Sequence, residues 1–231
     1  MITLRPANER GHASHGWLDS FHSFSFAEYY DPLHMGFSAL RVINDDTVAP
    51  GAGFAPHGHR DMEILSYVLA GSIRHQDSEG NIATLPAGEF QLMSAGQGIR
   101  HSEYNGSRTE ALRFLQIWIM PSTLGGEPGY QQKHFGSREG FTLIASPDGR
   151  DESFTVRQDA RVYQLLLAPG LSIALPLSAA RKGYLHLVEG ALSIQAEHLG
   201  PGDGAKLEGL DSPQVTNLGT SVVRALMFDL P

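Results

Sequence analysis

The chain is divided into short apolar runs by closely spaced turn residues, and this pattern constrains its fold more than any other feature. Three such runs are Ala39–Ile43, Ile64–Leu69 and Leu115–Ile119, each of strand length. The 26 Gly and 13 Pro residues interrupt the pattern too often for long helices. Many short strands with frequent turns are typical of a β-sandwich or a β-barrel. The sequence therefore predicts an all-β protein.

The length of 231 residues allows two small domains, each with a core of its own. The strand pattern stops at 121–129, where turn residues dominate, and this segment is the best candidate for a linker. We therefore expect an N-terminal barrel over residues 1–130 and a C-terminal barrel over residues 131–231.

A weak internal repeat supports two similar barrels. A strand that ends in a turn, followed later by a second turn, occurs at Tyr67–Gly71 and Leu85–Glu89. A similar pattern recurs at Leu187–Gly190 and Gly200–Asp203. The alternative explanation is that all-β proteins reuse such turns without any duplication.

Two residue pairs have the spacing expected of metal ligands. His57 and His59 lie two residues apart, so on a β-strand both imidazoles point to the same face. His101 and Glu103 repeat this spacing. On neighbouring strands the four side chains would converge at one point, as a ligand set that suits Fe, Mn, Ni, Cu or Zn. The chain has no cysteine, so any metal is held by nitrogen and oxygen.

The residues around these pairs strengthen the assignment, because an isolated pair would be a weak signal. The relevant positions are Gly51, His57, His59 and Glu63, then Gly98, His101 and Asn105. Their spacing resembles the two cupin motifs, G-x5-H-x-H-x3-E and P-x-G-x2-H-x3-N. Gly96 stands where the second motif usually has Pro, and we expect a small effect because both residues suit a turn.

A more specific resemblance is to the pirin family. It is carried by Gly16–Pro32 and by His101–Asn105, and it extends over the whole chain to Phe228–Pro231. The resemblance implies a bicupin, in which two antiparallel, jelly-roll-like β-barrels pack face to face, with one mononuclear metal site that commonly holds iron. Bacterial pirins include quercetin 2,3-dioxygenases, and nuclear ones act as redox-responsive transcription cofactors. The family ligands fall on His57, His59, His101 and Glu103.

Two glutamates compete for the role of the carboxylate ligand. In many other cupins the ligand is the glutamate of the first motif, here Glu63, whereas the resemblance to pirins favours Glu103. Strand geometry also favours Glu103, since it shares a face with His101. Glu63 would then orient a ligand imidazole, or would be an ordinary exposed carboxylate.

The second half has no comparable ligand set. The positions that correspond to the four ligands are Pro176, Ser178, Thr216 and Leu218. His186 and His198 are isolated, so structural or solvated roles are expected for them. We expect a metal-free C-terminal barrel that packs against the first barrel or covers it.

Several N-terminal side chains could border a substrate pocket. For the histidines we favour surface or core roles, and for the aromatic residues a substrate slot and core packing explain the sequence equally well. The histidines are His12, His15 and His22, and the aromatic residues are Phe24, Phe26, Tyr29 and Tyr30.

The resemblance implies an oxidoreductase that opens the heterocyclic ring of a flavonol such as quercetin, with O2 as co-substrate and release of CO. Glu103 would accept the proton of the 3-hydroxyl group. The cofactor would be one divalent transition metal per chain, with Fe(II) favoured and Cu, Mn, Ni, Co or Zn as alternatives. A rival hypothesis is a redox- or metal-responsive regulator that acts through a protein partner. A third is a cupin isomerase or sugar-binding protein.

Charge and hydropathy limit the partners and the location. The formal charge of −8 opposes direct binding to nucleic acid. No apolar run is long enough to cross a bilayer, and Met1–Arg5 leads into polar sequence without the apolar core of a signal peptide. We therefore expect a cytoplasmic monomer that does not associate with membranes.

Overall fold

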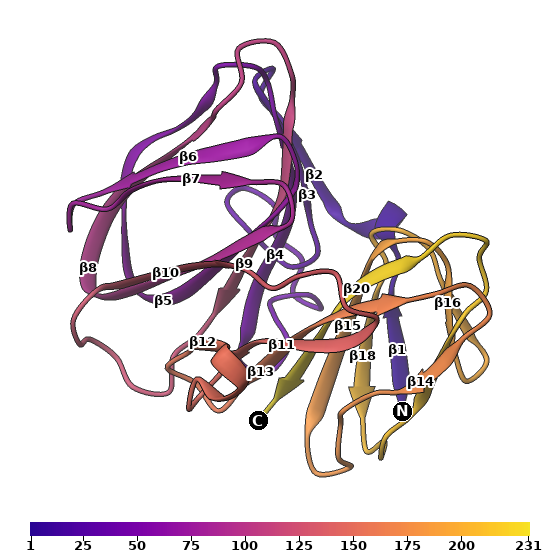
Figure 1. The fold of residues 1–231 in the computed structure, drawn as a ribbon. Helices are drawn as coiled ribbons and strands as arrows, with labels where there is room; N and C mark the ends of the chain where they lie inside the picture. The colour runs from indigo at the N-terminus through magenta and orange to yellow at the C-terminus, as the bar shows by residue number, and fades with distance from the viewer.

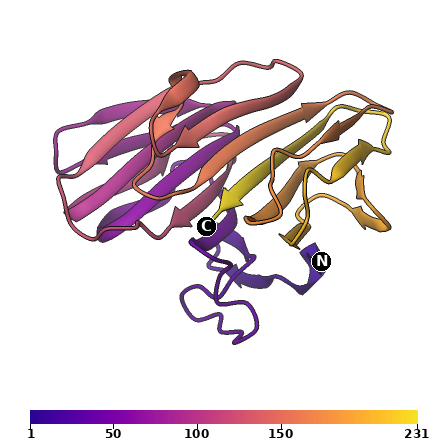
Figure 2. The same cartoon turned by 90° about the horizontal axis from the view of Figure 1, so that it is seen from below.

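The computed structural model describes all residues from 1 to 231 and consists mainly of β-strands. Two β-rich halves lie side by side (Figures 1 and 2). The helical content is two short 3-10 helices, η1 (Ala7–Glu9) and η2 (Arg150–Glu152). No helix has the length and apolar character needed to span a membrane. The all-β prediction is confirmed.

The first half is built on a nine-stranded sheet that wraps into a barrel (Figure 1). Its strand order is β2-β3-β4-β9-β5-β8-β6-β7, with β10 paired to β8. The strands are β2 (Gly11–Ser14), β3 (Leu18–His22), β4 (Leu40–Val48), β5 (Gly53–Ala70), β6 (Ser72–Asp77), β7 (Ile82–Pro86), β8 (Glu89–Asn105), β9 (Leu112–Ile119) and β10 (Gly129–His134).

The second half combines a seven-stranded sheet with a four-stranded sheet. The larger sheet has the order β1-β18-β15-β20-β13-β11-β12, and the smaller one β14-β19-β16-β17. The strands of the larger sheet are β1 (Ile2–Arg5), β11 (Gly140–Ser146), β12 (Phe154–Thr155), β13 (Arg161–Leu167), β15 (Lys182–Glu189), β18 (Gly204–Glu208) and β20 (Val223–Leu230). Those of the smaller sheet are β14 (Ser172–Ala174), β16 (Leu192–Ile194), β17 (Glu197–Leu199) and β19 (Gln214–Asn217).

One strand crosses between the halves. The first strand, β1, pairs with β18 at the edge of the second half, so the chain begins among the C-terminal strands (Figure 1). Strand β10 pairs with β8 and remains in the first half. A boundary at residue 130 therefore falls inside β10, and the irregular segment before β10 leads into a strand of the first barrel.

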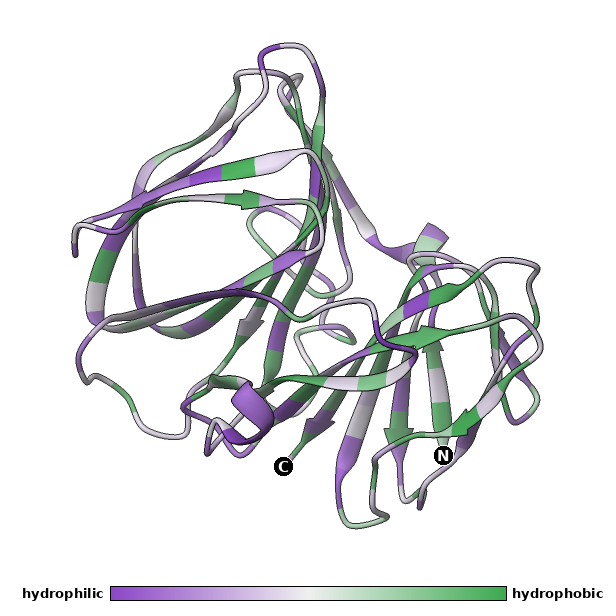
Figure 3. Ribbon diagram, in the orientation of Figure 1, coloured by the Kyte–Doolittle hydropathy of each residue, from purple (hydrophilic) through white to green (hydrophobic).

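The two halves share their largest hydrophobic core. This cluster of 22 buried residues takes Leu65 and Phe90 from the first barrel and Val162 and Phe228 from the second. A second cluster fills the C-terminal barrel, and two small ones lie inside the N-terminal barrel. Figure 3 shows hydrophobic and hydrophilic residues interspersed along the strands, as expected where one face of a sheet is buried. The barrels therefore pack face to face around a common apolar layer.

The structure gives a different reason for glycine at position 96 from the turn expected there. Gly96 lies inside β8, not in a turn, and its φ of 50° is one that the proline ring excludes. A Cβ atom at this position would lie 2.4 Å from the carbonyl oxygen of Gly126. Only glycine suits this backbone, which meets the segment between β9 and β10.

Candidate metal centre and its cavity

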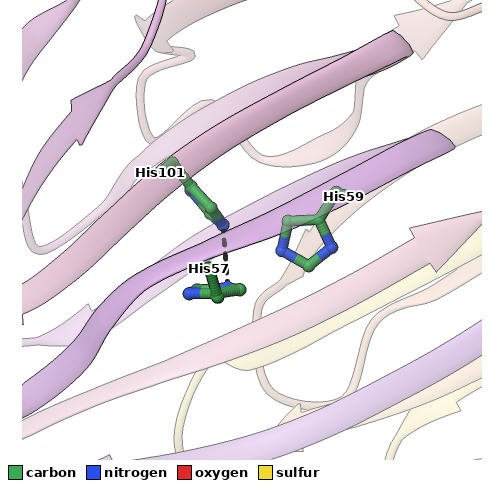
Figure 4. Close-up of side chains that lie close together, drawn as sticks. All are labelled: His57, His59 and His101. Atoms are coloured by element: carbon green, nitrogen blue, oxygen red, sulfur yellow. Dashed lines mark hydrogen bonds between the residues drawn. The ribbon is translucent and has the colours of Figure 1, made fainter.

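Three imidazoles converge inside the first barrel. His57 and His59 project from β5, and His101 projects from β8, where it lies directly opposite His57 in the antiparallel register (Figure 4). The ligand nitrogens of the three residues all lie within 4.8 Å of one another. His101 is buried, whereas His57 and His59 are partly exposed. The structure thus brings together three of the four residues that the sequence analysis proposed as metal ligands.

Irregularities in β5 aim these side chains. The pairing between β5 and β8 shifts register between Phe54 and His57, and again between His59 and Asp61. Asp61 has a φ of 67°, and its carboxylate accepts a hydrogen bond of 2.7 Å from the backbone N–H of Gly125. Bulges of this kind redirect side chains and are common next to functional sites.

The hydrogen bonds of His57 fix its tautomer. Its Nδ1 lies 2.8 Å from the carbonyl oxygen of Ala55, which can only accept, so Nδ1–H is the donor. In the neutral ring Nε2 then carries a lone pair, and this atom lies 3.1 Å from Nε2 of His101 (Figure 4). A backbone carbonyl on the second nitrogen is a common way to orient a ligand histidine.

Burial keeps two of the imidazoles neutral near pH 7. Desolvation, with a smaller effect from the neighbouring imidazoles, lowers the pKa of His59 to about 4 and the pKa of His101 to about 3. Metal ions bind the neutral form of histidine. The three side chains therefore fit a transition metal in position, and His59 and His101 fit it in protonation as well.

Glu103 shares the interior face of β8 with His101 but is engaged elsewhere. Gln91 Nε2 donates to its Oε1 at 2.8 Å, and Gln116 Nε2 donates to its Oε2 at 3.0 Å. The carboxylate forms a compact group with His101 and His75, and does not lie within 4.8 Å of all three clustered histidines at once. In this structure two amides hold the carboxylate beside the imidazoles.

The amide of Gln116 is itself oriented by a neighbour. Trp118 Nε1, which can only donate, lies 3.3 Å from Gln116 Oε1, so the NH2 group of Gln116 faces Glu103. The hydroxyl of Tyr130 is shared between the carbonyl oxygens of Gln91 and Gln132, at 3.1 and 2.9 Å. Sequence reasoning missed both glutamines because neither belongs to a short motif.

His75 is a further residue that sequence reasoning missed. It is buried on β6 opposite Glu103, and its Nε2 lies 3.1 Å from Asp77 Oδ2. The signal was available, since His75 and Asp77 have the same two-residue spacing as the predicted ligands.

Glu63 does not orient a ligand imidazole, so that expectation from the sequence is wrong. Its Oε2 accepts hydrogen bonds from Ser94 Oγ at 2.9 Å and from the backbone N–H of Arg157 at 3.2 Å. The side chain is fully buried and faces the second barrel, and burial raises its pKa. Glu63 is therefore also not an exposed carboxylate.

The imidazoles open into a cavity of about 690 Å³. This volume is within the range of small-molecule sites. Its aromatic walls are Trp17, Phe26, Phe54 and Trp118, and its polar lining includes His15, Ser20, His22, Asn44, Asp46, Glu103 and Gln116. His15 and His22 thus border the pocket, contrary to expectation. Of the aromatic residues considered, Phe26 lines it, whereas Phe24 is in the core and Tyr30 is exposed.

Comparison with known families and proteins gives consistent matches. Residues 3–119 match the Pirin family model, and residues 143–230 match a quercetinase C-terminal cupin domain. The chain is 51% identical over 231 residues to quercetin 2,3-dioxygenase of Escherichia coli strain K12, a match that covers 100% of this chain and 99% of the relative.

Solved structures show the same relationship. YhhW from Escherichia coli superposes with a TM-score of 0.97 at 51% identity, covering 100% of this chain and 98% of that one. The complex of the bacterial pirin YhhW with nickel(II) superposes with a TM-score of 0.96 at 50% identity, covering 100% and 99%.

Proposed function

The chain belongs to the pirin family, and from this premise we propose that it is a metal-dependent dioxygenase that opens the heterocyclic ring of a flavonol such as quercetin. The observation that carries the proposal is the cluster of three imidazoles in the wall of an aromatic-lined cavity. A relative with 51% identity is a quercetin 2,3-dioxygenase, and a relative with 50% identity binds nickel(II), which supports the same reading.

The proposed ligands of one divalent transition metal per chain are His57, His59, His101 and Glu103. Iron(II) is favoured, with copper, manganese, nickel, cobalt and zinc as alternatives. When bound, the ion would supply Lewis-acid activation of the flavonol oxygens and redox capacity for the reaction with O2. The C-terminal barrel would hold no metal.

Glu103 is proposed as the proton acceptor for the 3-hydroxyl group of the flavonol. Its carboxylate lines the cavity, and the amides of Gln91 and Gln116 orient it. A general base must lie within hydrogen-bond reach of the proton that it removes. In the overall reaction both atoms of O2 enter the product, two ring bonds break, one ring carbon leaves as CO, and the proton held by Glu103 returns to the product.

The aromatic walls would hold the planar substrate. Trp118 packs against His59 with ring centroids 5.1 Å apart, and Phe54 lies 6.3 Å from His57. A flat aromatic molecule stacked on these rings would have its oxygen atoms beside the imidazoles. Water would be displaced from the same surface.

Turnover of quercetin by the metal-loaded protein, compared in aerated and anaerobic buffer, tests the proposal. We expect loss of quercetin only with both metal and O2, and no loss with His101→Ala. The exposed His198 provides a matched control, because His198→Ala removes an imidazole from the other barrel. Absence of metal-dependent loss under air would overturn the proposal and, if metal still binds, favour the regulatory hypothesis. The cytoplasmic location and the monomeric state stay predictions.

A further inference from the structure

A second group of polar side chains lines the cavity, on two strands that carry none of the proposed ligands. Ser20 and His22 lie on β3, and Asn44 and Asp46 lie opposite them on β4, as the pairs Ser20–Asp46 and His22–Asn44. All four are buried, and all four line the cavity that contains the imidazoles. Polar groups in such a position are costly unless they have partners.

All four members of this group satisfy part of their hydrogen-bonding capacity among themselves. His22 Nδ1 lies 2.8 Å from Asn44 Oδ1, and Ser20 Oγ donates to Asp46 Oδ1. The second carboxylate oxygen of Asp46 has no hydrogen bond within the protein, and no cation pairs with this residue. Asp46 is therefore a buried carboxyl group with one oxygen left for a ligand.

The preceding residue shows how a structural aspartate is satisfied in the same strand. Asp45 receives two hydrogen bonds of 2.9 Å from Arg113 and lies 3.7 Å from Arg10. Its side chain points to the opposite face of β4, away from the cavity. The aspartate on the outer face of β4 thus has arginine partners, whereas the aspartate on the cavity face has none.

We propose that Asp46, with Ser20 beside it, anchors a phenolic hydroxyl group of the substrate at the side of the cavity away from the imidazoles. The inference rests on the proposed function, since it names how the same cavity recognises a polyhydroxylated aromatic substrate. Asp46 would thereby be a positioning and specificity residue, because the hydroxyl group held there determines which end of the substrate faces the imidazoles.

Two neighbouring aromatic rings link the two polar ends of the cavity: Phe54, which lines it, and Phe114, which is buried. Phe54 lies 6.3 Å from His57 and 6.4 Å from Phe114, measured between ring centroids. Phe114 is the residue directly opposite Asp46 in the pairing of β4 with β9. A flat molecule that covers Phe54 would therefore have one edge near the imidazoles and the other near Asp46.

The protonation of Asp46 favours a hydroxyl group over an anion. Burial, together with the charges of Asp45 and Glu103, raises the pKa of this carboxyl to about 7 against the effect of the Ser20 hydrogen bond. Near neutral pH the carboxyl group is thus present both as the ionised form, which accepts hydrogen bonds, and as the protonated form, which can also donate one. A phenolic hydroxyl can pair with either form, whereas a carboxylate or phosphate would be repelled by the ionised one.

Anaerobic binding to the metal-loaded protein tests the anchor without turnover. The chain has two tryptophans, Trp17 and Trp118, and both line the cavity, so quenching of intrinsic fluorescence reports its occupancy. The probes are quercetin and 3-hydroxyflavone, which keeps the 3-hydroxyl and lacks every other hydroxyl group. We expect Asp46→Ala to weaken quercetin binding roughly tenfold or more, and to leave 3-hydroxyflavone binding nearly unchanged.

Two further variants complete the test. Asp46→Asn keeps an oxygen acceptor and is expected to restore part of the quercetin affinity. Asp19→Asn changes a partly exposed aspartate on β3 that does not line the cavity, and is expected to affect neither probe. Equal weakening for both probes, or no weakening for quercetin, would overturn the anchor. Binding that depends on Asp46 without consumption under air would instead retain the anchor and overturn the dioxygenase proposal.

Discussion

The Nε2 atoms of His57 and His101 lie 3.1 Å apart, on facing residues of β5 and β8. Two ligand nitrogens, each about 2.1 Å from one ion and at right angles to each other, would be about 3 Å apart. Without a bound ion, the barrel therefore already holds these two atoms at the separation expected of two ligands of one metal ion.

This spacing predicts that metal stabilises the folded chain. The loaded protein should unfold at a higher temperature than protein treated with a chelator, with a gain of about 2.7 kcal/mol at a metal concentration 100 times its Kd. Replacement of His101 by Ala should abolish both the gain and the bound metal, as measured by calorimetry and elemental analysis. His198→Ala should behave like the wild type, and equal metal content in both variants would contradict the ligand assignment.

The amide of Gln116 predicts a positioning effect on Glu103. Gln116→Leu keeps a side chain of similar size but removes the donor to Oε2, so the carboxylate is held through Oε1 alone and its orientation is less fixed. Loss of a group that orients a metal-site residue typically costs about 10- to 100-fold in activity. We expect kcat for quercetin to fall by that factor while KM changes little, in steady-state assays. Gln97→Leu, at an exposed position of β8, serves as the control. A change confined to KM would argue against positioning.

His186 predicts a loss of stability in acid. Burial, with a further contribution from Arg10, lowers its pKa to about 4. An unfolded histidine titrates near 6.5, so between these values the unfolded chain binds a proton that the folded chain does not. This residue should therefore reduce the free energy of unfolding as pH falls below about 6.5, by about 2 kcal/mol at pH 5.

Urea unfolding from pH 7 to pH 5 measures this effect. The His186→Gln variant should lose less stability than the wild type over this range, because glutamine does not titrate. His198→Gln, at an exposed position, should follow the wild type. Parallel pH profiles for the wild type and His186→Gln would show that His186 is not the source.

Two glycines predict different costs for the same substitution. Gly51 and Gly96 both have positive φ, 69° and 50°, so alanine is strained by roughly 1–2 kcal/mol at either position. At Gly51 no atom lies within 4 Å of the added Cβ, whereas at Gly96 it meets the carbonyl oxygen of Gly126 at 2.4 Å. Gly96→Ala should therefore cost a further 1–3 kcal/mol, about the penalty for overpacking. Urea unfolding of both variants measures the difference, and equal values would contradict the close approach.

The parts of the site that depend on local spacing could be predicted from the sequence. His57, His59 and His101 follow from two-residue spacing on strands and from the glycines around them. Glu63 could not be placed in this way, because the register shift between His59 and Asp61 reverses which residues of β5 face inward. Beyond the shift Ile64 packs inside the barrel, while Leu65 belongs to the core between the barrels.

The remaining site residues are brought together only by pairing between distant strands. Asn44 on β4 lies opposite Gln116 on β9, and Gln116 lies opposite Ser66 on β5. No motif joins them, so their convergence depends on the sheet order. Asp46 was missed for the same reason, since in the sequence it is one of two adjacent aspartates with nothing to distinguish them.

The pairing of β1 with β18 also affects how the chain can be divided. Residues 2 to 5 complete the edge of a sheet whose other strands lie more than 130 residues further along the chain. Cleavage of the backbone between the barrels would give two polypeptides that still share a sheet and a core. Neither fragment is therefore a self-contained domain. In chimeras built by exchanging cupin barrels, the C-terminal barrel should therefore be exchanged together with this N-terminal strand.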